Sequence, residues 1–222
     1  MKASRILRGQ SNADCRTEAV TLLEEAAKAG SSEAKHRLAE FYEFGWGVEI
    51  EMRRARALYQ EAAEEGHVAS AYSLGAILLE GKGGRVDLRS AADWFRRAAQ
   101  AGDMLAVYAL GRCLRDGRGV SRNQKEGVRL ILRAARAGVV DGEFSAGFAY
   151  SRGAGVRQNV ETALKWYKRA ARKGDAVAAH NIGTIFRSGK GTVPANPKKA
   201  EYWFQRADEL RSKLIGDRPP WK

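Results

Sequence analysis

The sequence predicts an all-α protein built as a solenoid of helix–turn–helix repeats, and three observations support this fold class. Small residues recur at a fixed step of 36 residues along most of the chain. Within each step, apolar residues fall at spacings of three, four and seven, which is the pattern of one helix face. The composition, 44% hydrophobic with 24 Gly and only 4 Pro, suits closely packed helices better than a β-sandwich.

The 36-residue period is carried by several rows of residues that keep the same register. Single glycines form the row Gly30, Gly66, Gly102, Gly138 and Gly174, each preceded by an alanine pair. Glycine pairs form the row Gly45/Gly47, Gly81/Gly83, Gly117/Gly119, Gly153/Gly155 and Gly189/Gly191. A further small residue recurs as Ala39, Gly75, Gly111, Gly147 and Gly183. Since all rows repeat in step, each unit is predicted to be one structural repeat.

Each repeat is predicted to hold two helices. The first contains apolar residues such as Ala91 and Phe95 and ends at Gly102, which acts as a C-terminal cap. The second runs from about Ala106 to Leu114, after which the glycine pair lets the backbone turn through positive φ. Polar residues are expected to cap the next first helix, in the row Asp87, Asn123, Asn159 and Asn196-Pro197. The count is six first helices, the last at about residues 198–213, and five second helices.

Two of the rows indicate how the repeats pack. The small residue at the Gly111 row permits close approach of neighbouring helices. An aromatic row, predicted as Trp94, Trp166 and Tyr202, would fill the space between units. Gly127 stands where another repeat has Ala91, which suggests a local adjustment of the packing.

Units such as AADWFRRAAQAGDMLAVYALGRCLRDGRGV (91–120) and ALKWYKRAARKGDAVAAHNIGTIFRSGKG (163–191) resemble Sel1-like repeats, which are relatives of the tetratricopeptide repeat. The resemblance covers roughly residues 17–210 and implies a right-handed solenoid. The predicted organisation is an N-terminal tail at 1–15, a solenoid of about five repeats plus a capping helix at 16–214, and a C-terminal tail at 215–222.

No constellation of residues indicates catalysis, a metal or a cofactor. His36 and His180 stand four repeats apart, and Cys15 and Cys113 have no partners at ligand spacing. The sequences GKGG (81–84) and GKGT (189–192) follow helices and lack the spacing of a phosphate-binding loop. We therefore predict a protein that is not an enzyme.

The two cysteines and the lack of a long apolar run favour a cytoplasmic protein, with no membrane insertion. The first thirteen residues hold three basic side chains and no acid, which would also suit a mitochondrial targeting segment. The net charge of +13 is uneven, because residues 67–222 hold 29 basic and 14 acidic side chains. An anionic partner, either an acidic peptide or RNA, is consistent with this charge, and so is a merely solvated basic surface.

The resemblance implies that the second helices line a concave groove that binds a protein or peptide. Aromatic residues and arginines gather at the implied groove positions, and such residues are enriched at interfaces. The candidate residues are His36, Tyr72, Tyr108, Arg112, Arg115, Phe144, Phe148, Arg152, His180, Asn181 and Arg187. The alternative for Tyr72, Tyr108 and Phe144 is packing between adjacent repeats.

Trp46 is a second candidate, because it occupies the middle of a glycine pair where other repeats have small or polar residues. It is either a contact surface at the edge of the solenoid or a packing partner of the N-terminal tail. The sequence thus predicts a non-catalytic scaffold or adaptor for protein interactions. The alternative is a basic structural or assembly factor of a ribonucleoprotein, such as a mitochondrial ribosome.

Overall fold

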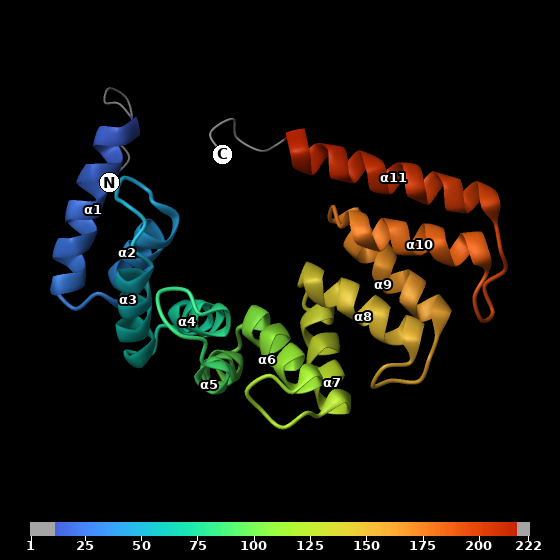
Figure 1. Cartoon of the computed structure of the whole chain (residues 1–222), viewed down its shortest axis with the longest axis horizontal. Coiled ribbons are helices and arrows are strands. Elements are labelled where there is room, and N and C mark those ends of the chain that lie inside the picture. Colours follow the sequence, from blue (N-terminus) through green and yellow to red (C-terminus); the bar gives the residue numbers. More distant parts are fainter. Residues whose placement is uncertain (1–11, 217–222) are drawn as a thin grey trace. The chain divides into compact units, whose positions relative to one another are not determined.

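The computed structural model describes residues 12–216 and, within them, the side chains of residues 16–213. Over this part the chain forms eleven helices and no extended strand (Figure 1). Consecutive helices pack together from α1 to α5 and from α7 to α11. The first helices of the repeats are α1 (Asn12–Lys28), α3 (Met52–Glu64), α5 (Leu88–Gln100), α7 (Gln124–Arg136), α9 (Val160–Arg172) and α11 (Pro197–Gly216). The second helices are α2 (Ser32–Phe44), α4 (Val68–Glu80), α6 (Met104–Asp116), α8 (Val140–Arg152) and α10 (Ala176–Ser188). The predicted all-α repeat fold is confirmed.

Polar caps fix the start of α5, α7, α9 and α11, as predicted. The side chains of Asp87, Asn123 and Asn159 accept hydrogen bonds from the backbone N–H three residues later, at 3.0, 3.0 and 2.8 Å. Asn196 does the same for α11, whose first residue is Pro197. Each such cap typically stabilises a helix by ~1 kcal/mol. The recurring polar residue therefore sets where every later repeat begins.

The chain divides into two compact units, which we describe separately. Unit 1 comprises residues 1–106 and 118–120, and unit 2 comprises residues 107–117 and 121–222. Tyr59, Leu74 and Phe95 are among the most deeply buried side chains of unit 1. Ile131 and Ile182 are among those of unit 2. In both units the core lies between the first and second helices.

The small-residue row lies where the first helix of the next repeat crosses a second helix. A Cβ atom added at Gly147 would lie 2.6 Å from the ring of Tyr167, and one added at Gly183 would lie 2.7 Å from the ring of Phe204. Both distances are shorter than van der Waals contact. The predicted close approach of helices at this row is confirmed.

Gly127, a departure from the repeat pattern, lies at one of these crossings, between α6 and α7. A Cβ at Gly111 on α6 would lie 2.9 Å from the carbonyl oxygen of Gly127 on α7. A Cβ at Gly127 would in turn lie 2.6 Å from the carbonyl oxygen of Gly111. The backbones of α6 and α7 therefore approach each other directly. Ile131 stands where the other crossings have an aromatic ring. Glycine at both positions permits the two helices to touch.

The predicted aromatic row is wrong at its last member. Trp94 and Trp166 are half-buried, whereas Tyr202 is 59% exposed. The turn before α11 contains one extra residue, since Asn159 and Asn196 are 37 residues apart where other caps are 36 apart. The half-buried residue equivalent to Trp166 is therefore Trp203. The turn with the extra residue contains an isolated antiparallel β-bridge between Lys190 and Val193, and the Val193 side chain is buried.

Two charged clusters join consecutive repeats at equivalent positions with opposite signs. In unit 1, Lys35 on α2 pairs with Glu61 and Glu65 at the end of α3. In unit 2, Glu143 on α8 bonds Arg169 at 2.8 Å and Lys173 at 3.0 Å, at the end of α9. Each member of the second cluster stands three 36-residue repeats after its counterpart. The fold thus accepts either polarity at this contact.

The predicted tails lie largely outside the described residues, as does the proposed targeting segment. The parts that are described, residues 12–15 and 215–216, are helical, because α1 begins at Asn12 and α11 ends at Gly216. Among the described residues, no helix is both long enough and apolar enough to span a bilayer.

Candidate functional site

Unit 2 contains a surface groove of about 690 Å³ formed by α6, α7 and α8. Five of the residues predicted from the sequence line it together, namely Tyr108, Arg112, Arg115, Phe144 and Phe148. We call this the aromatic groove. It brings together predicted residues that are as far as 40 positions apart in the sequence.

Helical spacing aligns the side chains of the aromatic groove. Tyr108 and Arg112 are four residues apart on α6, and Phe144 and Phe148 are four apart on α8, so each pair shares a face. The Arg112 guanidinium lies 5.8 Å from the centroid of the Tyr108 ring. The Tyr108 hydroxyl lies 3.1 Å from the Ser145 hydroxyl, which fixes the ring against α8.

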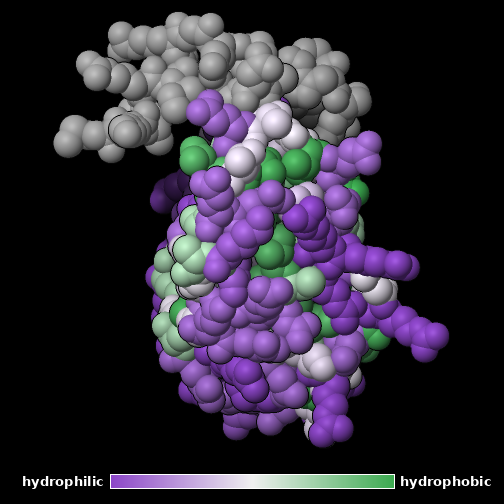
Figure 2. Space-filling view, turned by 90° about the vertical axis from the view of Figure 1, so that its left-hand side faces the viewer, coloured by the Kyte–Doolittle hydropathy of each residue, from purple (hydrophilic) through white to green (hydrophobic). Residues whose placement is uncertain are grey.

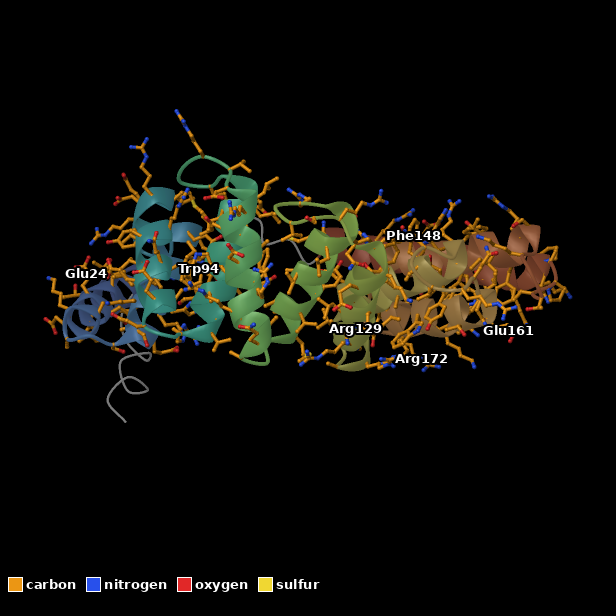
Figure 3. All side chains as sticks on the ribbon, turned by 90° about the horizontal axis from the view of Figure 1, so that it is seen from below. Glu24, Trp94, Arg129, Phe148, Glu161 and Arg172 are labelled. Atoms are coloured by element: carbon orange, nitrogen blue, oxygen red, sulfur yellow. The ribbon has the colours of Figure 1, made fainter. Side chains whose placement is uncertain are left out.

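The three aromatic rings differ in exposure. Tyr108 and Phe144 are half-buried, and the Phe144 ring lies 5.8 Å from that of Tyr167, so part of their surface packs between repeats. Phe148 is 45% exposed. Figure 3 shows Phe148 on the side of unit 2 away from Arg129 and Arg172. Phe148 is thus the most accessible apolar side chain of the groove.

The two arginines on α6 have different roles. Arg115 donates two hydrogen bonds to the carboxylate of Asp116, at 2.7 and 2.8 Å, and this pairing raises the pKa of Arg115. Arg122 donates to the Arg115 carbonyl at 3.1 Å. Arg112 is exposed and forms no ion pair with an acid among the described residues. Among the described residues, Arg112 and Arg122 therefore line the groove without an ion pair to an acid, whereas Arg115 is neutralised by Asp116.

A second hollow, of about 130 Å³, adjoins the groove, because Phe148 lines both. We call it the polar depression. Arg152 and Asn181, both predicted from the sequence, line it together with Ser151, Tyr167 and Lys190. The Arg152 guanidinium lies 5.9 Å from the centroid of the Phe148 ring.

The polar depression contains a hydrogen-bonded network. The Lys190 ammonium donates to the Ser151 hydroxyl at 3.1 Å, and the side chains of Asn181 and Ser151 lie beside the Tyr167 hydroxyl. Burial raises the pKa of Tyr167 to about 12, so the hydroxyl keeps its proton at neutral pH. The network therefore carries the positive charge of Lys190 and no negative charge of its own.

The remaining groove candidates lie elsewhere. His36 in unit 1 is only 7% exposed and bonds the Ser70 hydroxyl at 2.9 Å, and burial lowers its pKa. Tyr72 is half-buried against Phe95. His180 and Arg187 in unit 2 are exposed and lie 5.1 and 5.3 Å from the ring of Phe204. None of these four lines the aromatic groove or the polar depression.

Trp46 lies in an exposed apolar cluster of unit 1. It is 42% exposed, its ring stacks on that of Phe44 at 5.1 Å, and Phe44 and Ile50 are themselves 53% and 64% exposed. Figure 2 shows hydrophobic residues among hydrophilic ones on the face of unit 1 that carries α1. The role of Trp46 as an edge contact stays a prediction.

Sequence reasoning missed Ser151, Tyr167 and Lys190 as members of a site. Each belongs to a different row of the repeat, and the rows meet only when the helices are stacked. The available signal was a comparison between repeats, since Glu43, Tyr59 and Lys82 stand three repeats earlier in the same rows. Within the described residues no cluster of three or more His, Cys, Asp or Glu is placed to bind a metal.

The family model described as Sel1 repeat matches six successive segments, at residues 8–31, 32–67, 68–103, 105–139, 140–175 and 176–209. The chain therefore belongs to the Sel1 repeat family. Members of this family are generally protein-interaction scaffolds and are generally not catalytic. No curated protein matches the sequence significantly.

Solved structures with the same fold include a Sel1 repeat protein from Oxalobacter formigenes, at 28% identity and a TM-score of 0.78. That similarity covers 86% of this chain and 76% of the other. A protective antigen of uropathogenic Escherichia coli has 27% identity and a TM-score of 0.77. That similarity covers 87% of this chain and 41% of the antigen. An immunity protein from Pseudomonas aeruginosa has 21% identity and a TM-score of 0.58, over 98% of this chain and 91% of the other. At this identity the similarity shows a shared fold alone.

Proposed function

We propose that the chain is a non-catalytic adaptor whose aromatic groove in unit 2 holds a peptide segment of a partner protein. The observation that carries this proposal is Phe148, which is 45% exposed inside a groove of about 690 Å³. Exposed aromatic side chains set in a groove mark binding sites. The family provides the general expectation of a protein partner.

The groove offers two kinds of contact to a peptide. Phe148 and the exposed parts of Tyr108 and Phe144 offer apolar surface for a side chain, and aromatic anchors dominate most interfaces. The Arg112 guanidinium offers forked donors for a carboxylate. A partner segment with an apolar residue beside an acid fits both.

The charges around Phe148 favour an acidic segment. The aromatic groove is lined by Arg112, Arg115 and Arg122 against Asp116 and Asp141, a balance of one positive charge. The adjoining polar depression adds Arg152 and Lys190 with no acidic residue in its lining. Positive potential over such a surface steers an acidic partner and speeds association.

No specific observation supports the alternative, a structural or assembly factor of a ribonucleoprotein. Several arginines and lysines of unit 2 are in ion pairs, as Arg115 is with Asp116 and Arg169 with Glu143. These charges are partly neutralised within the protein. This neutralisation weakens attraction to RNA phosphates and so favours the peptide partner.

The proposal is tested by selecting peptides from a random phage-displayed library against the purified full chain. Phe148→Asp is expected to weaken binding of the selected peptides at least ~30-fold, because loss of an interface anchor typically costs ~2 kcal/mol or more. Arg112→Glu should also weaken acidic peptides. Affinities are measured by fluorescence anisotropy, and melting by circular dichroism, where exposed substitutions should cost only ~0.5 kcal/mol.

Tyr202→Asp is the matched control, since Tyr202 is an exposed aromatic residue of unit 2 outside both hollows. It should leave the affinity unchanged. The proposal fails if no peptide is selected, or if Phe148→Asp binds as tightly as Tyr202→Asp.

A further inference from the structure

In unit 1, the carboxylate of Glu43 stands at the repeat position that Ser151 of the polar depression occupies in unit 2. The Glu43 carboxylate on α2 accepts a hydrogen bond from the Tyr59 hydroxyl at 3.0 Å. It also lies 4.0 Å from the Lys82 ammonium, and the Ser73 side chain lies beside the Tyr59 hydroxyl. A tyrosine, a lysine and a small polar residue thus surround one carboxylate.

The same arrangement recurs in unit 2 without its carboxylate. Tyr167, Asn181 and Lys190 stand three 36-residue repeats after Tyr59, Ser73 and Lys82, and Ser151 stands three repeats after Glu43. The tyrosine hydroxyl and the lysine again converge on this position, where the Ser151 hydroxyl replaces the longer acid. The hollow of about 130 Å³ lies at this place.

The charge of the polar depression in unit 2 differs from that of the equivalent place in unit 1. In unit 1, Lys82 is neutralised by Glu43 and also by Glu80, at 2.8 Å. In unit 2, Lys190 and Arg152 both line the depression, and no acid lines it. Two cations beside a half-buried hydroxyl network form a favourable environment for an oxyanion.

We propose that the polar depression binds a carboxylate of the partner peptide in the position that Glu43 occupies in unit 1. The carboxylate accepts hydrogen bonds from the Lys190 ammonium and from the Ser151 hydroxyl, and the Arg152 guanidinium covers it from the side of Phe148. This inference rests on the proposed function, because it places an acid of the peptide next to the apolar residue that contacts Phe148.

The first experiment restores the internal carboxylate. Ser151→Glu should reproduce the arrangement at Glu43, fill the depression and weaken acidic selected peptides at least tenfold, while the helical signal and melting temperature stay at or above those of the parent. Val177→Glu adds the same charge at an exposed position of α10 outside both hollows and should change the affinity less than twofold. Equal affinities for the two variants would overturn the inference.

Lys190→Gln keeps the inference testable if Ser151→Glu does not fold. It removes the cation at a half-buried turn position and should weaken the same peptides about tenfold. It should not affect versions of these peptides in which the acids are replaced by amides. An equal loss for the acidic and amide peptides would contradict a carboxylate site.

The second experiment does not depend on any selected peptide. N-acetylglutamate amide is titrated into the isotope-labelled chain, with N-acetylglutamine amide as the neutral control, and backbone NMR shifts are followed. The acid should shift the signals of Ser151, Asn181 and Lys190, and the shifts should vanish in Ser151→Glu. Shifts from both compounds, or from neither, would overturn the inference, and so would stronger shifts from inorganic phosphate than from the acid.

The two experiments separate this inference from the proposed function. If the glutamate derivative binds but no peptide is selected, the carboxylate site stands and the peptide groove fails. If selected peptides depend on Phe148 but not on Ser151 or Lys190, the groove stands and the carboxylate site fails.

Discussion

Replacing both Arg169 and Lys173 by alanine is expected to lower the free energy of unfolding by ~3 kcal/mol, because it leaves a buried carboxylate without its cations. Glu143 is 0% exposed, and its Oε1 atom bonds both cations. Its Oε2 atom has no hydrogen-bond partner in the described part of the chain. The cost is measured by chemical denaturation followed by circular dichroism.

The chain itself provides the control for this prediction. The triple variant Glu143→Lys, Arg169→Glu, Lys173→Glu copies the polarity of the cluster formed by Lys35 and should recover most of the lost stability. Glu143→Leu, which removes the buried charge instead of its partners, should cost much less than the double alanine variant. A double alanine variant that unfolds like the parent would show that Glu143 does not depend on its cations.

Gly111→Leu is expected to be comparably destabilising, by ~3 kcal/mol, near the upper end of what overpacking usually costs. A Cβ atom alone would lie 2.9 Å from the Gly127 carbonyl oxygen and 3.0 Å from the Ile131 side chain. Backbone cannot move aside as a flexible side chain can, so α6 and α7 must separate. Gly111→Ala should show a smaller loss of the same kind, measured from melting curves.

Ala109→Leu is the matched control for the Gly111 prediction. Ala109 lies on the same helix and is half-buried rather than at the crossing. Its substitution should cost less than 1 kcal/mol, which is typical of positions away from tight packing. If Gly111→Leu melted like Ala109→Leu, the crossing of α6 and α7 would not be as tight as the distances indicate.

The repeat period predicted most of the fold because each row has a local physical cause. Asp87, Asn123 and Asn159 cap helices through their own neighbours in sequence, and Gly102 and Gly117 adopt positive φ that other residues resist. Such features depend on few long-range contacts. They fixed the order and the bounds of the helices to within a few residues.

The misassigned aromatic row shows where a fixed period fails. One extra residue before α11 shifts every later position, so Tyr202 faces solvent and Phe204 takes the place against Gly183. The spacing of the caps Asn159 and Asn196 carries the signal of this insertion, whereas a fixed step of 36 residues leads from Trp166 to Tyr202.

The candidate site was predicted only in part, because charge pairing and burial depend on neighbouring helices. The groove residues Tyr108, Arg112 and Phe148 meet as expected from helical spacing. The pairing of Arg115 with Asp116 and the burial of His36 could not be deduced from a row of residue types. Glu143 was likewise not recognised as a buried acid, since its row holds alanine, valine or lysine in other repeats.

NMR mapping of a selected peptide on the full chain shows directly whether the aromatic groove of unit 2 is the surface that binds a partner segment. We expect the largest shifts on the signals of Tyr108, Arg112, Phe144 and Phe148, with smaller ones around Ser151 and Lys190. Shifts centred instead on Phe44, Trp46 and Ile50 would contradict it and assign recognition to the apolar cluster of unit 1.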